Sequence, residues 1–224
     1  FNSHEARGEV PESRYVDAVV RDLEASVPRV WGRRVHAIFV GGGTPSLFSA
    51  KAIDRLLTAA RTLLTVEPDA EITLEANPGT FEQEKFRDFR AAGVNRLSVG
   101  IQSFDDERLR AIGRVHDAGE ARRAVEIALA TFDNVNLDLM YALPGQSVEA
   151  ALADIRTAIG FAPQHLSAYH LTLEPNTVFH RYPPALPDDD SAAAMQEAIE
   201  AALAQAGYGH YETSAFAKPG RGSR

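Results

Sequence analysis

Apolar and polar positions along the chain follow two kinds of pattern, which alternate five times. Short β-prone runs cover residues 35–40, 71–76, 96–101, 135–140 and 165–171, and between them apolar residues recur every three or four positions. These are the periods of strands and of helices. Strands that are separated by single helices run parallel with right-handed crossovers. The pattern therefore predicts an α/β fold, either a doubly wound sheet or a barrel.

Helical spacing begins ahead of the first strand, between Pro11 and Pro28. A repeating β/α fold would then have a strand before residue 1. Further helices are expected over 50–64, before Gly93, over 105–112 and 117–131, after Ser147 and over 191–206. Residues 174–190 hold four prolines and predict a long irregular segment, and a short strand is expected over 208–211, after the last helix. We expect a barrel over residues 1–175, and a linker with the start of a C-terminal domain over 176–224.

The first predicted strand leads directly into three glycines, Gly41 to Gly43. Glycine permits unusual backbone angles and close approach of a ligand, and exposed N–H groups there can hold a carboxylate, an amino-acid headgroup or a phosphate. Thr44 and Pro45 break the dinucleotide fingerprint, and no Gly-Lys-Ser/Thr follows to make a phosphate-binding P-loop. Such turns also occur for steric reasons alone, so the turn by itself leaves ligand binding open.

Composition excludes several classes of protein. Lys and Arg number 23 against 31 Asp and Glu, and the basic residues are scattered, which argues against a nucleic-acid surface. No apolar stretch reaches the roughly 20 residues of a membrane span, and the first residues do not resemble a signal peptide, so we expect a cytoplasmic protein. The chain has no cysteine, and its seven histidines lack metal-binding spacing, so we expect no metal ligands in it.

Polar residues or glycine occupy the carboxyl ends of the five predicted strands, where ligands bind in parallel β/α folds. They are Gly41 to Thr44, Glu75 with Asn77, Gln102 with Ser103, Asp138, and His170 with Thr172. Taken singly, a strand-end acid can cap a helix or pair with an arginine, Arg114 can be a solvated helix-end charge, and His116 a surface or capping residue. Their joint placement on one rim is what predicts a binding site.

Seven motifs carry a resemblance to a known family. They are VGGGTPS at 40–46, TLEANPGT at 73–80, NRLSVGIQSF at 95–104, GRVH at 113–116, DLMYALPGQ at 138–146, HLSAY through LEP at 165–175, and YETSAFA at 211–217. In this order they resemble the radical S-adenosylmethionine (SAM) enzymes of the oxygen-independent coproporphyrinogen III oxidase family. The resemblance covers nearly the whole chain.

The resemblance implies an open parallel (β/α)6 partial TIM barrel, here without its first strand, that binds SAM and a [4Fe-4S] cluster. Gly42, Gly43 and Thr44 match the glycine motif whose backbone meets the methionine end of SAM. Other SAM-contacting positions of the family match Glu75, Gln102, Arg114 and Asp138, with Thr172 a weaker match. Acidic and amide groups would hold the ammonium and ribose hydroxyls, and Arg114 would neutralise the carboxylate. No catalytic residue is implied in this chain.

The chain departs from the family at both ends. The family holds its cluster with a Cys-x3-Cys-x2-Cys motif, and Phe1-Asn2-Ser3 resembles the residues that follow the third cysteine. The family's His-Asn-x-x-Tyr-Trp segment would begin soon after Ser223. We therefore expect a fragment that lacks the cluster cysteines and the C-terminal region, and that is inactive on its own because no cluster can activate SAM.

Three functions remain open at this point. The Phe-Asn-Ser continuation, the turn at 75–80 and the motif at 211–220 resemble a heme chaperone branch, which implies heme or porphyrin as ligand and a respiratory hemoprotein as recipient. The alternative is the oxidase, which decarboxylates coproporphyrinogen III oxidatively to protoporphyrinogen IX in heme biosynthesis. A third is an unrelated aldolase-like barrel, which would need a Schiff-base lysine at a strand end, and no predicted strand ends in lysine. Whether the chain is an enzyme is left open.

Overall fold

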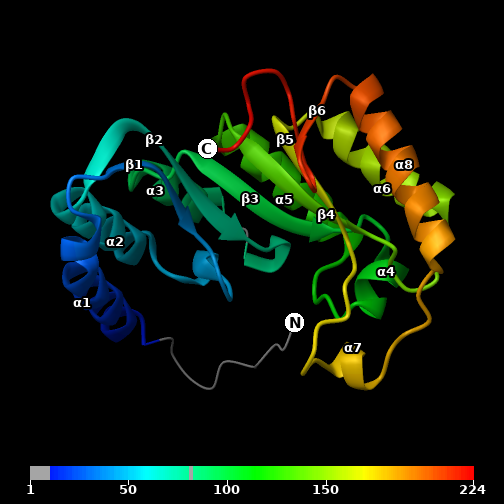
Figure 1. The fold of residues 1–224 in the computed structure, drawn as a ribbon, viewed down its shortest axis with the longest axis horizontal. Helices are drawn as coiled ribbons and strands as arrows, with labels where there is room; N and C mark the ends of the chain where they lie inside the picture. Colours follow the sequence, from blue (N-terminus) through cyan, green and yellow to red (C-terminus); the bar gives the residue numbers. More distant parts are fainter. Residues whose placement is uncertain (1–10, 81–82) are drawn as a thin grey trace.

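The computed structural model describes residues 11–80 and 83–224, so the Phe1-Asn2-Ser3 match lies outside the described residues. Its strands form one seven-stranded sheet of order β1-β2-β3-β4-β5-β7-β6 (Figure 1). The strands are β1 Arg34–Val40, β2 Thr65–Ala76, β3 Arg96–Gln102, β4 Val135–Tyr141, β5 His165–His170, β6 Gly209–Glu212 and β7 Ala215–Ala217. The α-helices are α1 Glu12–Val30, α2 Ala50–Leu63, α3 Gln83–Ala91, α4 Asp106–Ala111, α5 Ala118–Thr131, α6 Val148–Phe161, α7 Val178–Arg181 and α8 Asp189–Gln205. Two short 3₁₀ turns, Pro45–Leu47 and Pro78–Thr80, follow β1 and β2.

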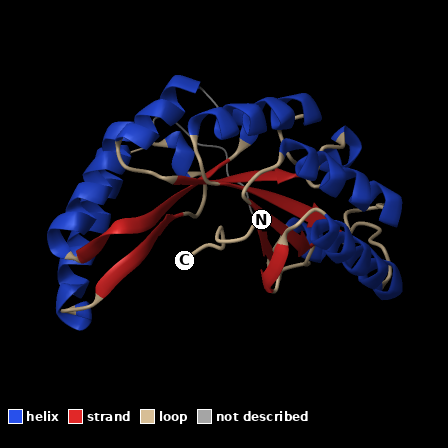
Figure 2. Ribbon diagram, turned by 90° about the horizontal axis from the view of Figure 1, so that it is seen from above, coloured by secondary structure: helices blue, strands red, loops and turns tan. Residues whose placement is uncertain are grey.

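The sheet is a curled half-barrel. Strands β1 to β5 are parallel neighbours in sequence order, while β7 runs antiparallel to β5 and β6 antiparallel to β7. Figure 2 shows the helices along the convex side and the sheet bending away from them. The predicted α/β barrel type is thus confirmed in preference to a doubly wound sheet, whose helices would cover both faces.

The two faces of the strands differ in polarity. Ile72 and Leu74 on β2, Leu97 on β3 and Leu137 on β4 are buried in the core against the helices. Residues that alternate with them point to the concave face, and there they are polar. A half-barrel whose open face carries polar groups can hold a polar ligand, whereas a closed barrel would be filled with apolar side chains.

Local signals in the sequence set the helix boundaries. Ser147 caps α6 as predicted, because its side chain accepts a hydrogen bond from the backbone N–H of Ala150 at 3.2 Å. Asp117 and Glu120 form a reciprocal capping box at the start of α5. Gly93, with φ of +106°, follows α3 and ends it as predicted.

Some predicted boundaries are wrong. Helix α1 passes Pro28 and ends at Val30. Strand β2 begins at Thr65, six residues before the predicted start, and contains Pro68. The register between β1 and β2 shifts between Val35 and Ala37, so β2 carries an irregularity there, which is where a strand tolerates proline.

The C-terminal part joins the same sheet. The irregular segment 174–190 contains the single helical turn α7, and β7 was not predicted because three residues are too short to show a period. Helix α8 contacts α6, and β7 pairs with β5. The predicted division after residue 175 stays a prediction. No helix within residues 11–80 and 83–224 combines the length and apolarity that a bilayer crossing requires.

Candidate functional site

The glycine turn after β1 is shaped by one carboxylate. Gly42 has φ of +107°, and its N–H donates a hydrogen bond to Glu75 Oε2 at 3.0 Å. A Cβ on Gly41 would lie 2.6 Å from the Phe39 ring and 3.0 Å from Glu75 Oε2, whereas a Cβ on Gly43 would meet nothing within 4 Å. A Cβ at position 41 would therefore displace the exposed Phe39 ring, glycine is favoured at 42 by its backbone angle, and Gly43 faces open space.

Thr44 links this turn to the end of β2. Its hydroxyl donates to the carbonyl oxygen of Gly43 at 2.8 Å and accepts from Asn77 Nδ2 at 3.3 Å. These bonds tie the glycine turn to the end of β2. The backbone near Gly43 is thus fixed in place but remains accessible to a ligand.

Glu75 forms no ion pair with an arginine among residues 11–80 and 83–224, a pairing that the sequence left as an alternative. Burial raises the pKa of its carboxyl group, the Gly42 N–H opposes that shift, and the charge of Asp138 adds to it. Among the described residues, its carboxylate accepts a hydrogen bond from Gly42. The carboxylate can still accept hydrogen bonds from a ligand.

Gln102 at the end of β3 is strained and incompletely bonded. Its φ is +62°, its side chain is 2% exposed, and its Nε2 lies 3.5 Å from the Tyr169 hydroxyl. Its buried Oε1 has no hydrogen-bond partner among the described residues. Left-handed backbone at a non-glycine residue and an orphaned buried acceptor both cost free energy, and both occur characteristically at binding sites.

Arg114, in the turn after α4, is half-buried, and its guanidinium forms no hydrogen bond or ion pair with the described residues. Burial lowers its pKa, and the neighbouring Tyr169 and Asp138 oppose that shift. The alternative of a solvated helix-end charge is therefore wrong. A half-buried, unpaired cation is costly unless an anion binds beside it.

Asp138 on β4 lies among hydroxyl and amide groups of the concave face. Ser98 Oγ donates to its Oδ2 and Asn136 Nδ2 to its Oδ1, each at 2.8 Å. Burial raises the pKa of Asp138, while hydrogen bonds from Ser98, Asn136 and Ser167 and the charge of Arg96 lower it. Its carboxylate is oriented by hydrogen bonds.

Tyr169 on β5 is the central residue that the sequence analysis did not select as a site residue. Burial raises the pKa of its phenol, and the nearby charges of Asp138, Arg114 and Glu75 also act on it. It therefore stays protonated at neutral pH. Polar residues at every second position of β5, His165, Ser167 and Tyr169, are a signal that could have found it.

The structure thus groups Glu75, Gln102, Arg114 and Asp138 around Tyr169, with the glycine turn joined through Glu75. Thr172 is exposed beyond β5, and its Oγ1 lies 3.5 Å from the carbonyl oxygen of His170. Within the described part of the chain, no hydrogen bond connects Thr172 to this group.

Two residues near the rim have structural roles. Ser103 is buried and donates to Asp154 Oδ2 at 2.6 Å on the helix side of the sheet. His116 is buried, with Nε2 3.2 Å from the carbonyl oxygen of Ile101, so its expected surface location is wrong. No group of three or more potential metal-ligating side chains gathers within residues 11–80 and 83–224.

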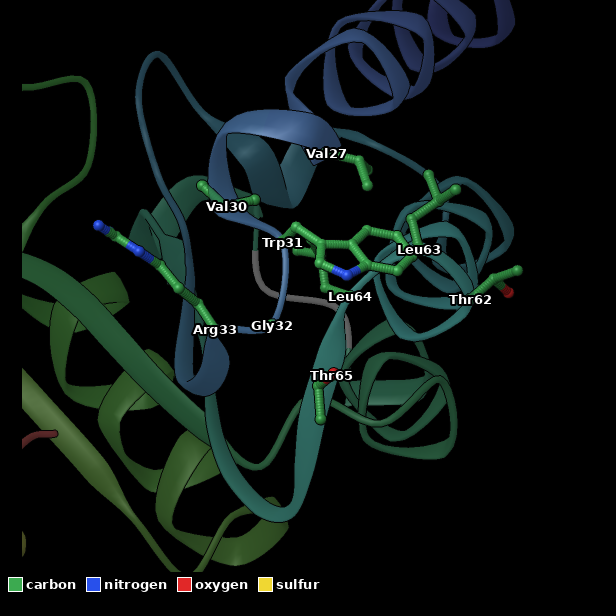
Figure 3. A pocket seen from close by; sticks show the side chains of 9 residues that line it. All are labelled: Val27, Val30, Trp31, Gly32, Arg33, Thr62, Leu63, Leu64 and Thr65. Atoms are coloured by element: carbon green, nitrogen blue, oxygen red, sulfur yellow. The ribbon is translucent and has the colours of Figure 1, made fainter.

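A separate cavity of about 360 Å³ lies at the opposite, amino-terminal ends of β1 and β2. Figure 3 shows the Trp31 ring beside Leu63 and Leu64, with Arg33 directed away from it. Trp31 is 81% exposed, and no carboxylate or histidine lines the cavity. The cavity therefore lacks the carboxylates that gather at the carboxyl-end rim.

Comparisons with known proteins identify the family of the chain. Residues 2–158 match the model of the radical SAM superfamily. The heme chaperone HemW of Escherichia coli is 52% identical over 221 residues, which cover 98% of this chain and 58% of that protein. HemW of Haemophilus influenzae is 48% identical, with coverage of 98% and 59%.

Among solved structures, the coproporphyrinogen III oxidase HemN of Escherichia coli, described as a radical SAM enzyme, aligns with a TM-score of 0.82 and 29% identity. The alignment covers 93% of this chain and 49% of that one. The chain thus spans less than two thirds of the length of each of these three relatives. The family model covers more than half of the chain, and we conclude that the chain belongs to the radical SAM superfamily.

Proposed function

We propose that the carboxyl-end rim of the half-barrel binds S-adenosylmethionine, with Arg114 taking the carboxylate of its methionine moiety. The observation that carries this proposal is the half-buried Arg114 guanidinium, which has no hydrogen-bond or ion-pair partner among the described residues. Arg114 interacts electrostatically with Tyr169, whose hydroxyl lies 3.5 Å from Nε2 of Gln102, and Oε1 of Gln102 is buried without a partner among the described residues. A ligand that brings both an anion and hydrogen-bond donors would satisfy both groups. SAM has a carboxylate, an ammonium, two ribose hydroxyls and an adenine amine.

The remaining site residues fit the same ligand. Glu75 and Asp138 are acceptors suited to the ammonium and the ribose hydroxyls, and Gln102 Oε1 is suited to one further donor. The backbone beside Gly43 leaves room for close approach, and Thr44 holds that backbone in place. Thr172 stays a weaker candidate because it is exposed and its hydroxyl bonds the carbonyl oxygen of His170.

The family also implies a [4Fe-4S] cluster, which supplies the electron that cleaves SAM reductively when it is bound. This chain contains no cysteine, so its own residues do not fit the thiolate ligation of such a cluster. The proposal for these residues is therefore confined to binding and orienting SAM.

Calorimetric titration of SAM into the full-length, cluster-loaded protein tests this site. Arg114→Gln and Glu75→Gln should each weaken binding by about 1–3 kcal/mol, because each removes one charge-assisted interaction. Arg110→Gln, at an exposed position of α4, is the matched control and should leave the affinity unchanged. Wild-type affinity in the Arg114 and Glu75 variants would remove both residues from the site.

For the whole protein we propose a heme chaperone that binds heme and passes it to a recipient hemoprotein. The support is the identity of 52% and 48% to two proteins named heme chaperone HemW over nearly the whole chain. Heme titration followed by absorbance, and transfer of that heme to an apo-hemoprotein, tests this function.

The second candidate is the oxidase, which the similarity to HemN favours at a TM-score of 0.82. Conversion of coproporphyrinogen III to protoporphyrinogen IX by the cluster-loaded protein, without heme transfer, would establish the oxidase and refute the chaperone.

A further inference from the structure

Below the rim, a chain of hydrogen bonds connects Asp138 with the C-terminal segment. Asn136 Nδ2 lies 2.8 Å from Asp138 Oδ1, and Asn136 Oδ1 lies 2.7 Å from His165 Nδ1. His165 Nε2 lies 2.6 Å from the Tyr211 hydroxyl, which lies 3.0 Å from the backbone nitrogen of Ser223. The members come from β4, β5, β6 and the last residues of the chain, so the chain of bonds spans the concave face.

The direction of each bond follows from chemistry. The Asn136 amide nitrogen faces the Asp138 carboxylate and the Ser98 hydroxyl, each at 2.8 Å, and a carboxylate can only accept. The Asn136 oxygen must therefore face His165. Because that oxygen is an acceptor, Nδ1 of His165 carries the proton, and Nε2 accepts from the Tyr211 hydroxyl.

The far end of the chain of bonds is anchored by ionic groups. The Tyr211 oxygen accepts from the Ser223 N–H, and Ser223 Oγ donates to Glu71 Oε1 on β2 at 2.7 Å. Arg224 pairs with Asp69 at 2.7 Å. Figure 2 shows the C-terminal segment lying on the concave side of the sheet, between its two arms. Residues 218–224 thus bridge from β6 to β2.

We propose that His165 and Tyr211 are positioning residues for Asp138, and that docking of residues 209–224 on the concave face is thereby coupled to ligand binding at the rim. Along the whole series of bonds, from the Ser223 N–H to the Asn136 amide, each donor hydrogen is directed to the next member on the way to the Asp138 carboxylate. Bound in this way, Asn136 cannot turn its oxygen toward Asp138, and the carboxylate keeps one orientation. This inference rests on the proposed role of Asp138 in SAM binding.

The tautomer of His165 is the first test, and it does not depend on SAM. In ¹⁵N NMR spectra of the full-length protein without its cluster, His165 should be neutral with the proton on Nδ1. In His165→Gln, an amide can still donate to Asn136 and accept from Tyr211, whereas His165→Leu can do neither. The Asp138 pKa, followed by ¹³C NMR of its carboxyl group, should rise further in His165→Leu and change little in His165→Gln.

The second test is calorimetric titration of SAM into the cluster-loaded full-length protein. Tyr211→Phe and His165→Leu should weaken binding about three- to tenfold, and His165→Gln should restore most of it. Tyr208→Phe is the matched control, because Tyr208 is a buried tyrosine next to β6 whose hydroxyl bonds the carbonyl oxygen of Pro163 at 2.7 Å and not the chain of bonds to Asp138.

The outcomes separate this inference from the proposed function. A His165 proton on Nε2, or equal SAM affinity in Tyr211→Phe and Tyr208→Phe, would overturn the positioning role. A wild-type protein that does not bind SAM would refute the proposed function instead, while the His165 tautomer and the Asp138 titration would still decide the orientation of the hydrogen bonds.

Discussion

Acid should destabilise the fold through His165, and the size of the effect can be worked out from its environment. His165 is 2% exposed, and burial, with a smaller contribution from the charge of Arg96, lowers its pKa from 6.5 to about 4. The unfolded chain therefore binds a proton on this histidine at a higher pH than the folded chain. Stability conferred by the neutral imidazole is complete above the unfolded pKa and declines as the pH falls from about 6.5 toward about 4.

The magnitude follows from this difference in pKa. Between about pH 7 and about pH 4.5, the shift corresponds to a loss of about 2.5 kcal/mol in the free energy of unfolding, from the two proton-binding curves. Since glutamine does not titrate, His165→Gln should lose about 2.5 kcal/mol less than the wild type over this interval. Comparing the two losses cancels any change in stability that the substitution causes at neutral pH.

Urea unfolding followed by circular dichroism at both pH values provides the measurement. His180→Gln, at an exposed position of α7, serves as the control for removing one imidazole. Equal losses in the wild type and in His165→Gln would show that His165 is protonated as readily in the folded chain as in the unfolded one. That result would refute the buried, neutral histidine on which the reasoning depends.

Two further predictions concern backbone and buried polar groups. Gly42→Ala should destabilise the fold by about 1–2 kcal/mol, because an alanine at φ of +107° is strained. Gly43→Ala, the control, should change the free energy of unfolding by less than about 0.5 kcal/mol, because its Cβ would meet open space. Thermal unfolding of the two variants provides the comparison. A loss at position 43 as large as at position 42 would contradict this. Asp154→Ala should lower the free energy of unfolding by about 1–3 kcal/mol, because it leaves the Ser103 hydroxyl and the Phe104 N–H without their buried acceptor. Asp133→Ala, which removes an exposed carboxylate, should lower it by less than about 1 kcal/mol. Urea unfolding measures both values. Similar costs for the two aspartates would show that the buried bonds contribute little.

The order of strands and helices could be predicted because each carries a clear period and explicit end signals. Ser147 and Gly93 mark helix boundaries through side-chain capping and a left-handed angle, and both lie where expected. The start of β2 could not be predicted, because Pro68 argues against a strand unless the irregular pairing of β2 with β1 is known. Strand β7 depends on pairing with β5 and β6, which are distant in sequence.

The rim could be predicted because carboxyl ends of parallel strands meet at one edge of a sheet. The sequence could not predict which side chains have hydrogen-bond partners there. Ser103 and Gln102 are adjacent in sequence and face opposite sides of the sheet, yet Ser103 finds a buried acceptor in Asp154 whereas Oε1 of Gln102 has no partner among the described residues. Tyr169 gains its importance only from the charges that surround it in the folded chain.

The most direct test of the central claim is a crystal structure of the longer, cluster-loaded protein with SAM bound. The account predicts SAM at the carboxyl ends of β1 to β4, with its carboxylate at Arg114 and a donor group at Gln102 Oε1. SAM bound elsewhere, with Arg114 and Gln102 still without partners, would contradict it.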